Sequence, residues 1–417
     1  METKIKKIQD FIIIICITLF TMLPDYFYIG TQFYKYLIVI VLFIILYRGV
    51  EVKKVKYYLS YMLPVLMLAI ISYGYHKEIF TFLTYILTVF MPGFIVFSFI
   101  NKDSDLKRII YFLITVAIIL CVFGIVEWIT EKNVFSLIET IDLGTMGTRV
   151  KYRDDRPRIQ QSFGQPITFA LYLFFIFMLA FTQEKNNKKD KIVCISTMLL
   201  SFVGVYLTAA RFPFITLILF ILFIVLNRNK KEKILLFGFL FLILCLDLAT
   251  KQIIFSKIIN YTTLIKDAIW GIINRQNEVT DMNTTYRLQL IPILLPFIKQ
   301  KFFFGYGNVF MSSFTFKIFG FTHTSIDNSI LSNMMSHGFI GLIVFIMPII
   351  YGIVFSIKLI KRKDNNGKYY LCFLILYCLN LISVAQLSEK RIMIVFIAIL
   401  MAKYYNSSIK ENGGDLK

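Results

Sequence analysis

Apolar runs alternate with short polar stretches along most of the chain. A helix needs about 20 residues to cross a hydrocarbon core of about 30 Å. We therefore predict an all-α, polytopic membrane protein with about 12 transmembrane helices in a single integral membrane domain, residues 1–417. The predicted spans are residues 11–23, 34–47, 57–73, 79–100, 109–129, 166–181, 192–208, 212–226, 234–249, 338–357, 369–385 and 392–405.

Composition agrees with this pattern. Of the 417 residues, 58% are apolar and only 17% are charged, which is unusual for a soluble domain and leaves little chain for a second, soluble enzyme. The net charge of +20 arises from Lys and Arg clusters between apolar runs. Such clusters are typical of cytoplasmic loops, so we expect no nucleic-acid partner.

The distribution of Lys and Arg also predicts orientation. Of the 45 such residues, 26 lie in seven short segments on the side that holds the N-terminus. Of the 19 on the opposite side, 14 lie in two long segments, where the positive-inside rule is weak. We therefore expect a multi-pass protein of the bacterial cytoplasmic membrane with both termini in the cytoplasm.

Two long segments, residues 130–165 and 250–336, break the short-loop pattern on the outer side. Loops of this length are often functional. Within the second segment, residues 288–298 are apolar but too short to cross and contain Pro292 and Pro296. We predict a short interfacial or re-entrant helix there.

The first long segment ends in a cluster of charges, with five cations and two acids between residues 149 and 158. Guanidinium groups match phosphate oxygens in a bidentate way, so one interpretation is an anion site. The alternatives are attraction to anionic lipid headgroups and local pairing with Asp154 and Asp155.

Few charges lie inside the spans. Arg211 sits in a tight turn, where it either points into an outer vestibule or snorkels to the surface. Glu127 and Asp247 lie near outer span ends, where we expect water rather than a function. His323 and His337 lie in or at the end of the second long segment, where an imidazole serves as a general base or is an idle surface group.

The sequence lacks the motifs of several common enzyme classes. It has no GxxxxGK[ST] loop, no HExxH motif and no cluster of Asp, Glu and His at metal-ligand spacing. All six cysteines lie in apolar runs, which indicates packing rather than disulfides or zinc. We expect neither ATP hydrolysis, nor a tightly bound metal, nor another cofactor. No internal repeat is evident, which weakens a transporter interpretation.

Six short motifs together carry a resemblance to a known family. They are residues 158–166 (RIQQSFGQP), 207–211 (LTAAR), 285–287 (TYR), 304–307 (FGYG), 327–331 (DNSIL) and 337–342 (HGFIGL). In this order and spacing they resemble the O-antigen polymerase and ligase superfamily (Wzy-like), over roughly residues 155 to 345.

The resemblance implies a membrane glycosyltransferase at the outer face of the membrane. In such polymerases a growing glycan on undecaprenyl pyrophosphate is transferred to an incoming lipid-linked repeat unit. The family's arginines bind the departing pyrophosphate, which implies this role for Arg158, Arg211 and Arg287, with Arg156 as a further partner. The implied partners are the undecaprenyl-pyrophosphate-linked oligosaccharide, membrane lipids, a chain-length regulator and a flippase.

The residue that would act as the catalytic base differs from the family pattern. Ligases of the superfamily often carry His before the Asn of the late outer loop, whereas Asp327 precedes Asn328 here. His323 would reach that role if residues 322–327 form a loop, and Asp327 is the alternative base. This difference favours a capsule or O-antigen polymerase over a ligase.

A lipid-linked glycan flippase is an alternative from another class. It would be expected to carry cations along a central cavity, whereas the arginine cluster here lies at the outer ends of the spans. A scaffolding membrane protein would need no such cluster.

Overall fold

The computed structural model describes residues 2–23, 26–29, 31–140, 148–153, 156–184, 187–227, 282–318, 321–323, 326, 328–381 and 387–414. Over these residues the protein is almost entirely helical. The long helices are α1 (Glu2–Met22), α2 (Phe33–Tyr47), α3 (Val52–Gly74), α6 (Asp103–Thr130), α7 (Pro166–Thr182), α8 (Lys188–Leu207), α9 (Arg211–Leu226), α12 (Met282–Gln300), α14 (Ser329–Lys361), α15 (Gly367–Leu381) and α16 (Leu387–Gly414).

Shorter elements complete the fold. The helix α4 (Ile79–Tyr85), the π-helix η1 (Ile86–Phe90) and α5 (Met91–Phe99) follow one another as a single rod, and α13 (Asn308–Ser313) is a short helix. Two 3₁₀ helices are η2 (Val134–Ile138) and η4 (Gln161–Phe163). The strands form three antiparallel hairpins, β1 (Tyr28–Ile29) with β2 (Thr31–Gln32), β3 (Lys151–Arg153) with β4 (Arg156–Arg158), and β5 (Phe316–Ile318) with β6 (Phe321–His323).

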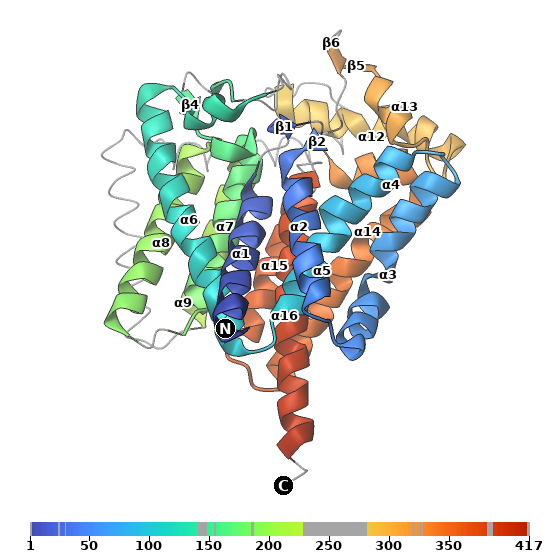
Figure 1. Cartoon of the computed structure of the whole chain (residues 1–417). Coiled ribbons are helices and arrows are strands. Elements are labelled where there is room, and N and C mark those ends of the chain that lie inside the picture. Colours follow the sequence, from blue (N-terminus) through green and yellow to red (C-terminus); the bar gives the residue numbers. More distant parts are fainter. Residues whose placement is uncertain are drawn as a thin grey trace.

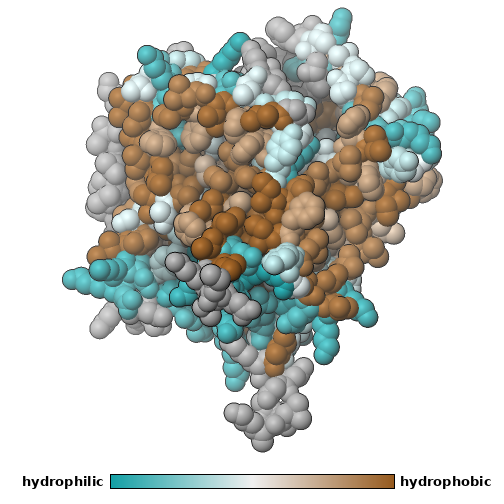
Figure 2. Space-filling view, viewed as in Figure 1, coloured by the Kyte–Doolittle hydropathy of each residue, from teal (hydrophilic) through white to brown (hydrophobic). Residues whose placement is uncertain are grey.

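The helices run up and down in one bundle (Figure 1). Both termini lie at one end, hereafter the terminal end, and the three hairpins, α12 and α13 lie at the other, hereafter the hairpin end. A hydrophobic belt covers the middle of the visible face, with hydrophilic residues towards both ends (Figure 2). This division is typical of a protein that spans a bilayer.

The structure confirms an all-α, multi-pass membrane protein. Six helices of the described residues are long and apolar enough to cross a membrane, and four shorter apolar helices of 10–17 residues accompany them. Eleven of the twelve predicted spans coincide with described helices, counting α4, η1 and α5 as one. The span predicted at residues 234–249 lies outside the described residues.

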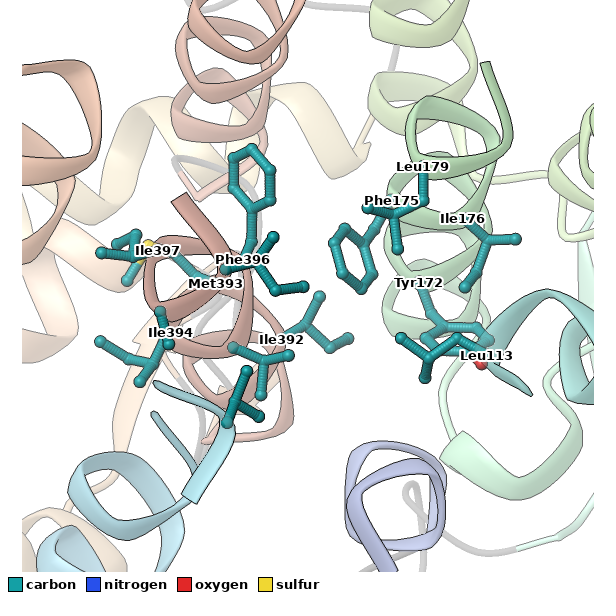
Figure 3. Packing of buried hydrophobic residues seen from close by; sticks show 14 of the residues in the cluster. Leu113, Tyr172, Phe175, Ile176, Leu179, Ile392, Met393, Ile394, Phe396 and Ile397 are labelled. Carbon is teal, nitrogen blue, oxygen red and sulfur yellow. The ribbon is translucent and has the colours of Figure 1, made fainter. Parts of the chain in front are cut away.

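The centre of the bundle is formed by α7 and the first half of α16. Nearly every residue of α7 is buried, which suits a helix that is apolar on all its faces. Pro166 begins this helix, where its fixed φ is favourable and its missing N–H is not needed. Phe175 of α7 and Phe396 of α16 point towards each other (Figure 3), with ring centroids 5.9 Å apart. The outer helices pack around this pair.

The predicted short helix around residues 288–298 is confirmed as the longer helix α12, at the hairpin end. Its inner face packs through Leu290, Leu294 and Ile298 into a small second core together with Phe314 and Met335. This core holds α12 and the β5–β6 hairpin against the start of α14.

Candidate functional site

The carboxylate of Glu127 organises one side of the hairpin end. Glu127 lies in the last turn of α6 and is only 1% exposed. Its Oε2 accepts hydrogen bonds from the backbone N–H of Gln160 (3.3 Å) and Gln161 (3.1 Å), and from the Gln161 side chain. The expectation that Glu127 meets water is therefore wrong, because the polar segment after β4 folds back over the end of its helix.

The segment that covers Glu127 is fixed from several directions. Gln161 has a φ of +48°, and its carbonyl accepts a hydrogen bond from Asn133 Nδ2 at 3.0 Å. The Tyr26 hydroxyl donates to the same carbonyl at 3.4 Å, and burial raises the pKa of this phenol. Residues 160–163 thus form a buried turn, held by the backbone and by side chains, at the hairpin end.

This turn brings two of the predicted arginine motifs together. The backbone N–H of Ile159 donates to the Leu207 carbonyl at 3.3 Å, and Arg158 Nε donates to the Thr208 carbonyl at 2.9 Å. Thr208 belongs to the tight turn that leads into Arg211, the first residue of α9. Residues 158–166 and 207–211 therefore form one structural unit, with Arg158 and Arg211 both half-buried.

The β3–β4 hairpin places like charges opposite one another. Its register pairs Lys151 with Arg158 and Arg153 with Arg156. Directly opposed like charges weaken a strand pair. Burial, together with the Arg158 charge, lowers the pKa of Lys151 to about 8, and Lys151 Nζ donates to the Gly164 carbonyl at 2.7 Å. This arrangement is well suited to an anion, which would relieve the repulsion between the cations.

The structure describes the other predicted site residues in less detail. Arg156 is exposed on β4. Arg287 lies in the second turn of α12, at the hairpin end, and the structure describes its backbone only. Asp327, like Asp154 and Asp155, lies outside the described residues.

His323 lies in β6, away from the hairpin that carries Arg158. Its strand partner is Phe316, and the two rings stack with centroids 5.7 Å apart. The β5–β6 hairpin and the β3–β4 hairpin stand well apart at the hairpin end (Figure 1). The condition under which His323 would serve as the base, a loop over residues 322–327, is not met at its start, because Thr322 and His323 pair with β5.

A break in α14 forms a second organised region. Gly338 has φ +68° and ψ −165°, which interrupts the helix between His337 and Phe339. The aromatic segment before α13 docks into this break through backbone hydrogen bonds from Tyr306 N to Met335 O and from Phe339 N to Phe302 O, of 2.8 and 2.7 Å. These bonds bring together two of the motifs that carry the family resemblance, residues 304–307 and 337–342, and a Cβ on Gly338 would lie 2.5 Å from the Phe304 nitrogen.

Glycine is required at this contact. A Cβ on Gly305 would lie 2.6 Å from the Gly338 nitrogen, and one on Gly338 would lie 2.3 Å from the Phe303 carbonyl carbon. Both glycines also have positive φ values. A third glycine, Gly341, leaves room for the His337 side chain, since a Cβ there would lie 2.1 Å from the His337 Cβ.

His337 lies inside the protein rather than at its surface. It is 1% exposed, and its Nε2 lies 3.1 Å from Ser72 Oγ and 3.3 Å from Asn308 Nδ2. Glu78 supports this group by accepting hydrogen bonds from the backbone N–H of Asn308 (3.1 Å) and Val309 (2.8 Å). The interpretation of His337 as a surface group is wrong, and its contacts indicate a role in joining α3, α13 and α14.

Sequence reasoning missed Glu78 and two cations at the start of α16. Lys390 Nζ lies 3.3 Å from Asn333 Oδ1, and the Arg391 guanidinium lies 4.1 Å from the Tyr34 ring centre. Arg391 is 1% exposed. The available signal was a Lys-Arg pair directly before an apolar run. Within the described residues, no three His, Cys, Asp or Glu side chains gather as metal ligands would.

Comparisons with known proteins agree with these motifs. The O-antigen ligase family matches residues 196–346. A relative from Acinetobacter baylyi, the ComP-specific O-oligosaccharyltransferase, is 24% identical over 404 residues, covering 89% of this chain and 67% of the relative. Residues 196–346 are thus similar to the O-antigen ligase family, within the superfamily that the sequence motifs resemble.

The superfamily match covers part of the candidate site. It includes Arg211, Arg287 and the break at Gly338, whereas Arg158 lies before it. The hydrogen bond from Arg158 to the Thr208 carbonyl links the matched segment to the preceding hairpin. Family and relative together support a membrane glycosyltransferase that uses a lipid-linked glycan.

Proposed function

We propose that this chain is a polysaccharide polymerase of the bacterial cytoplasmic membrane, with both termini in the cytoplasm and the hairpin end on the outer side. Its donor is a growing glycan on undecaprenyl pyrophosphate, and its acceptor is a lipid-linked repeat unit. Capsule or O-antigen is the class of product. A flippase that delivers the repeat unit and a chain-length regulator are the partners that such a reaction implies.

The reaction needs a base for the acceptor hydroxyl and cations for the leaving pyrophosphate. The bond between the anomeric carbon and the pyrophosphate oxygen breaks, and a bond to an acceptor hydroxyl oxygen forms. The hydroxyl proton passes to a base, and undecaprenyl pyrophosphate leaves with the bonding electrons. Preorganised cations stabilise the charge that develops on the leaving group.

The observation that carries the proposal is the opposed pair of Lys151 and Arg158, held beside the turn that leads into Arg211. Each of these two cations is tied to a backbone carbonyl, so their positions are set before substrate arrives. Preorganised cations lose less entropy on binding a diphosphate than mobile ones. Arg287 and Arg156 extend this set of cations in the proposal.

The base is proposed to be Asp327 or His323. Asn328 caps α14, since its side chain accepts hydrogen bonds from Ile330 N and Leu331 N at 2.9 and 3.0 Å. Asp327 directly precedes this cap in the sequence, and a carboxylate is able to accept the proton of an acceptor hydroxyl. His323 stacks on Phe316 and would have to leave that ring to reach an acceptor.

A ligase-type transferase is the second candidate. The matching family is described as O-antigen ligase, and the relative from Acinetobacter baylyi is an O-oligosaccharyltransferase, named as specific for ComP. Both functions start from the same leaving group, so the arginine site serves either. The Asp at position 327 favours the polymerase.

A reconstituted assay tests the proposal. The purified full chain in liposomes would be given lipid-linked repeat units alone, without another acceptor. A polymerase yields products of two or more repeat units and free undecaprenyl pyrophosphate. A ligase leaves the repeat units unjoined until its own acceptor is added.

A further inference from the structure

A polar cavity opens at the terminal end of the bundle, on the opposite side from the arginine site. Its volume is about 730 Å³, and it is lined by the start of α1, the connection between α2 and α3, and the connection between α5 and α6. The helix α6 leads from this cavity, at Asp103, to Glu127, 24 positions further along, a rise of about 36 Å at 1.5 Å per residue. The cavity is therefore no part of the proposed transfer site.

Cations outnumber acids in the cavity wall. The cations are Lys6, Arg48, Lys54, Lys102 and Arg108, and the acids are Asp10, Glu51 and Asp105. Asp10 binds both Arg48 (2.7 Å) and Arg108 (3.2 Å). Two of the carboxylates are thus engaged with arginines, because Asp105 also pairs with Arg108. The three lysines outnumber the remaining acid, Glu51, so the wall keeps an excess of positive charge.

Lys54 is the deepest of these cations. It is 4% exposed, and its Nζ donates to the Ile100 carbonyl at 2.9 Å and to Asn101 Oδ1 at 2.7 Å. Both acceptors are neutral. Over the residues that the structure describes, Lys54 makes no ion pair. Glu51 and Asp105 of the cavity wall attract this ammonium from beyond ion-pair distance, so an anion in direct contact would stabilise it further.

Ser98 provides an independent observation. Ser98 is one of the residues that line the same cavity, and its Oγ is buried. Among the described residues, this hydroxyl has no hydrogen-bond partner. Buried polar groups in native proteins normally find a partner, so an unpaired hydroxyl on a residue that lines this basic cavity points to a ligand.

We propose that this cavity binds a phosphate ester anion, supplied by the headgroup of an anionic phospholipid in the leaflet at the terminal end. Lys54 and Ser98 contact the phosphate oxygens, and Lys102 adds charge at the rim. Ile5, Ile45 and Phe99 in the wall suit the apolar part of a lipid. Basic pockets between transmembrane helices are a common form of site for phospholipid headgroups. A soluble phosphate ester shares this chemistry.

The test is binding of short-chain phosphatidylglycerol to the purified full chain in neutral detergent, followed by calorimetry. Short-chain phosphatidylcholine and glycerol phosphate are the comparison ligands. Lys54→Gln removes the charge and keeps a donor for the Ile100 carbonyl. Lys56→Gln, an exposed position of the same helix, is the matched control.

The wild type and Lys56→Gln should bind phosphatidylglycerol alike, and Lys54→Gln and Ser98→Ala should bind it about tenfold more weakly or worse. Weak binding of glycerol phosphate assigns the site to the lipid, and equal binding assigns it to a soluble ester. Equal affinity for phosphatidylcholine, or unchanged binding by Lys54→Gln, overturns the proposal. Chain-length assays of the same variants are a separate readout, so failure here leaves the polymerase proposal intact.

Discussion

Lys151 and Arg158 face each other directly across the β3–β4 ladder, and Arg158 also donates to the carbonyl of Thr208. Two cations held side by side in this way form the centre of the proposed pyrophosphate site. The arrangement joins the charge cluster of the first long segment to the tight turn between α8 and α9 that leads into Arg211.

Replacement of the arginines should abolish polymer formation. Arg158→Ala, Arg211→Ala and Arg287→Ala should each lower the transfer rate by about 10² or more, because a preorganised cation at the leaving group is lost. Arg→Lys should restore little activity, since an ammonium lacks the bidentate fork. The measurement is glycan chain length in a deletion strain that expresses each variant at equal level.

The matched control for these variants is Lys132→Ala, an exposed cation at the same end of the molecule. It should leave chain length unchanged. Normal chain length in both Arg158→Ala and Arg211→Ala would show that the site assignment is wrong.

Activity should fall at alkaline pH. The pKa of Lys151 is lowered to about 8, so the cation loses its proton as the pH rises through 8. Between pH 7 and pH 9 its charged fraction drops by about tenfold, and kcat/KM, which reports the free enzyme, should follow it. Lys151→Arg keeps its charge and should hold its activity to pH 9. Identical pH profiles for both proteins would remove Lys151 from the site.

Glu127 should act on the site through the turn it holds. Glu127→Ala removes the acceptor of three hydrogen bonds, which should lower the free energy of unfolding by on the order of 2–3 kcal/mol and reduce transfer together with it. Glu131→Ala, an exposed carboxylate near the same helix end, should change stability by about 0.5 kcal/mol or less. Thermal unfolding in detergent compares the two, and equal effects would argue against this role.

The contact between residues 304–307 and the break in α14 should tolerate no side chain. Gly305→Ala and Gly338→Ala should each destabilise the protein by about 1–3 kcal/mol or more, since the added Cβ meets backbone and the φ values are positive. Gly74→Ala is the control, because a Cβ at that position would meet no atom within 4 Å and its φ is not positive. If all three variants unfold at one temperature, the docking is not rigid.

The identity of the base is open to a direct comparison. Asp327→Asn should reduce transfer by about 10² or more if the carboxylate takes the acceptor proton, while His323→Ala should change it little. The reverse result would assign the base to His323. Single-turnover rates with saturating donor are the measurement, since they isolate the chemical step.

The helices could be predicted because the bilayer imposes their length and hydrophobicity. The boundary predicted between the second long segment and the span at 338–357 coincides with the break at Gly338, where His337 ends one helical piece and Phe339 begins the next. The sequence also marked the arginine motifs at residues 158–166 and 207–211, and the structure brings these two together, while their role in binding pyrophosphate stays a prediction.

The buried polar groups could not be predicted in this way. Glu127 was misjudged because its burial depends on a turn 33 and 34 residues later in the chain. The contact of His337 with Ser72 joins positions 265 residues apart. Hydropathy describes depth along a span, and it carries no information on which distant segment folds over the end of a helix.

The most direct measurement is the length distribution of surface glycan on a gel, from the source strain with this gene deleted and from the same strain complemented with the wild-type gene. The account predicts that the ladder collapses to single repeat units on deletion and returns on complementation. Full-length glycan that remains lipid-linked would indicate a ligase. Loss of all glycan at the outer face would indicate a flippase. An unchanged ladder would contradict the central claim.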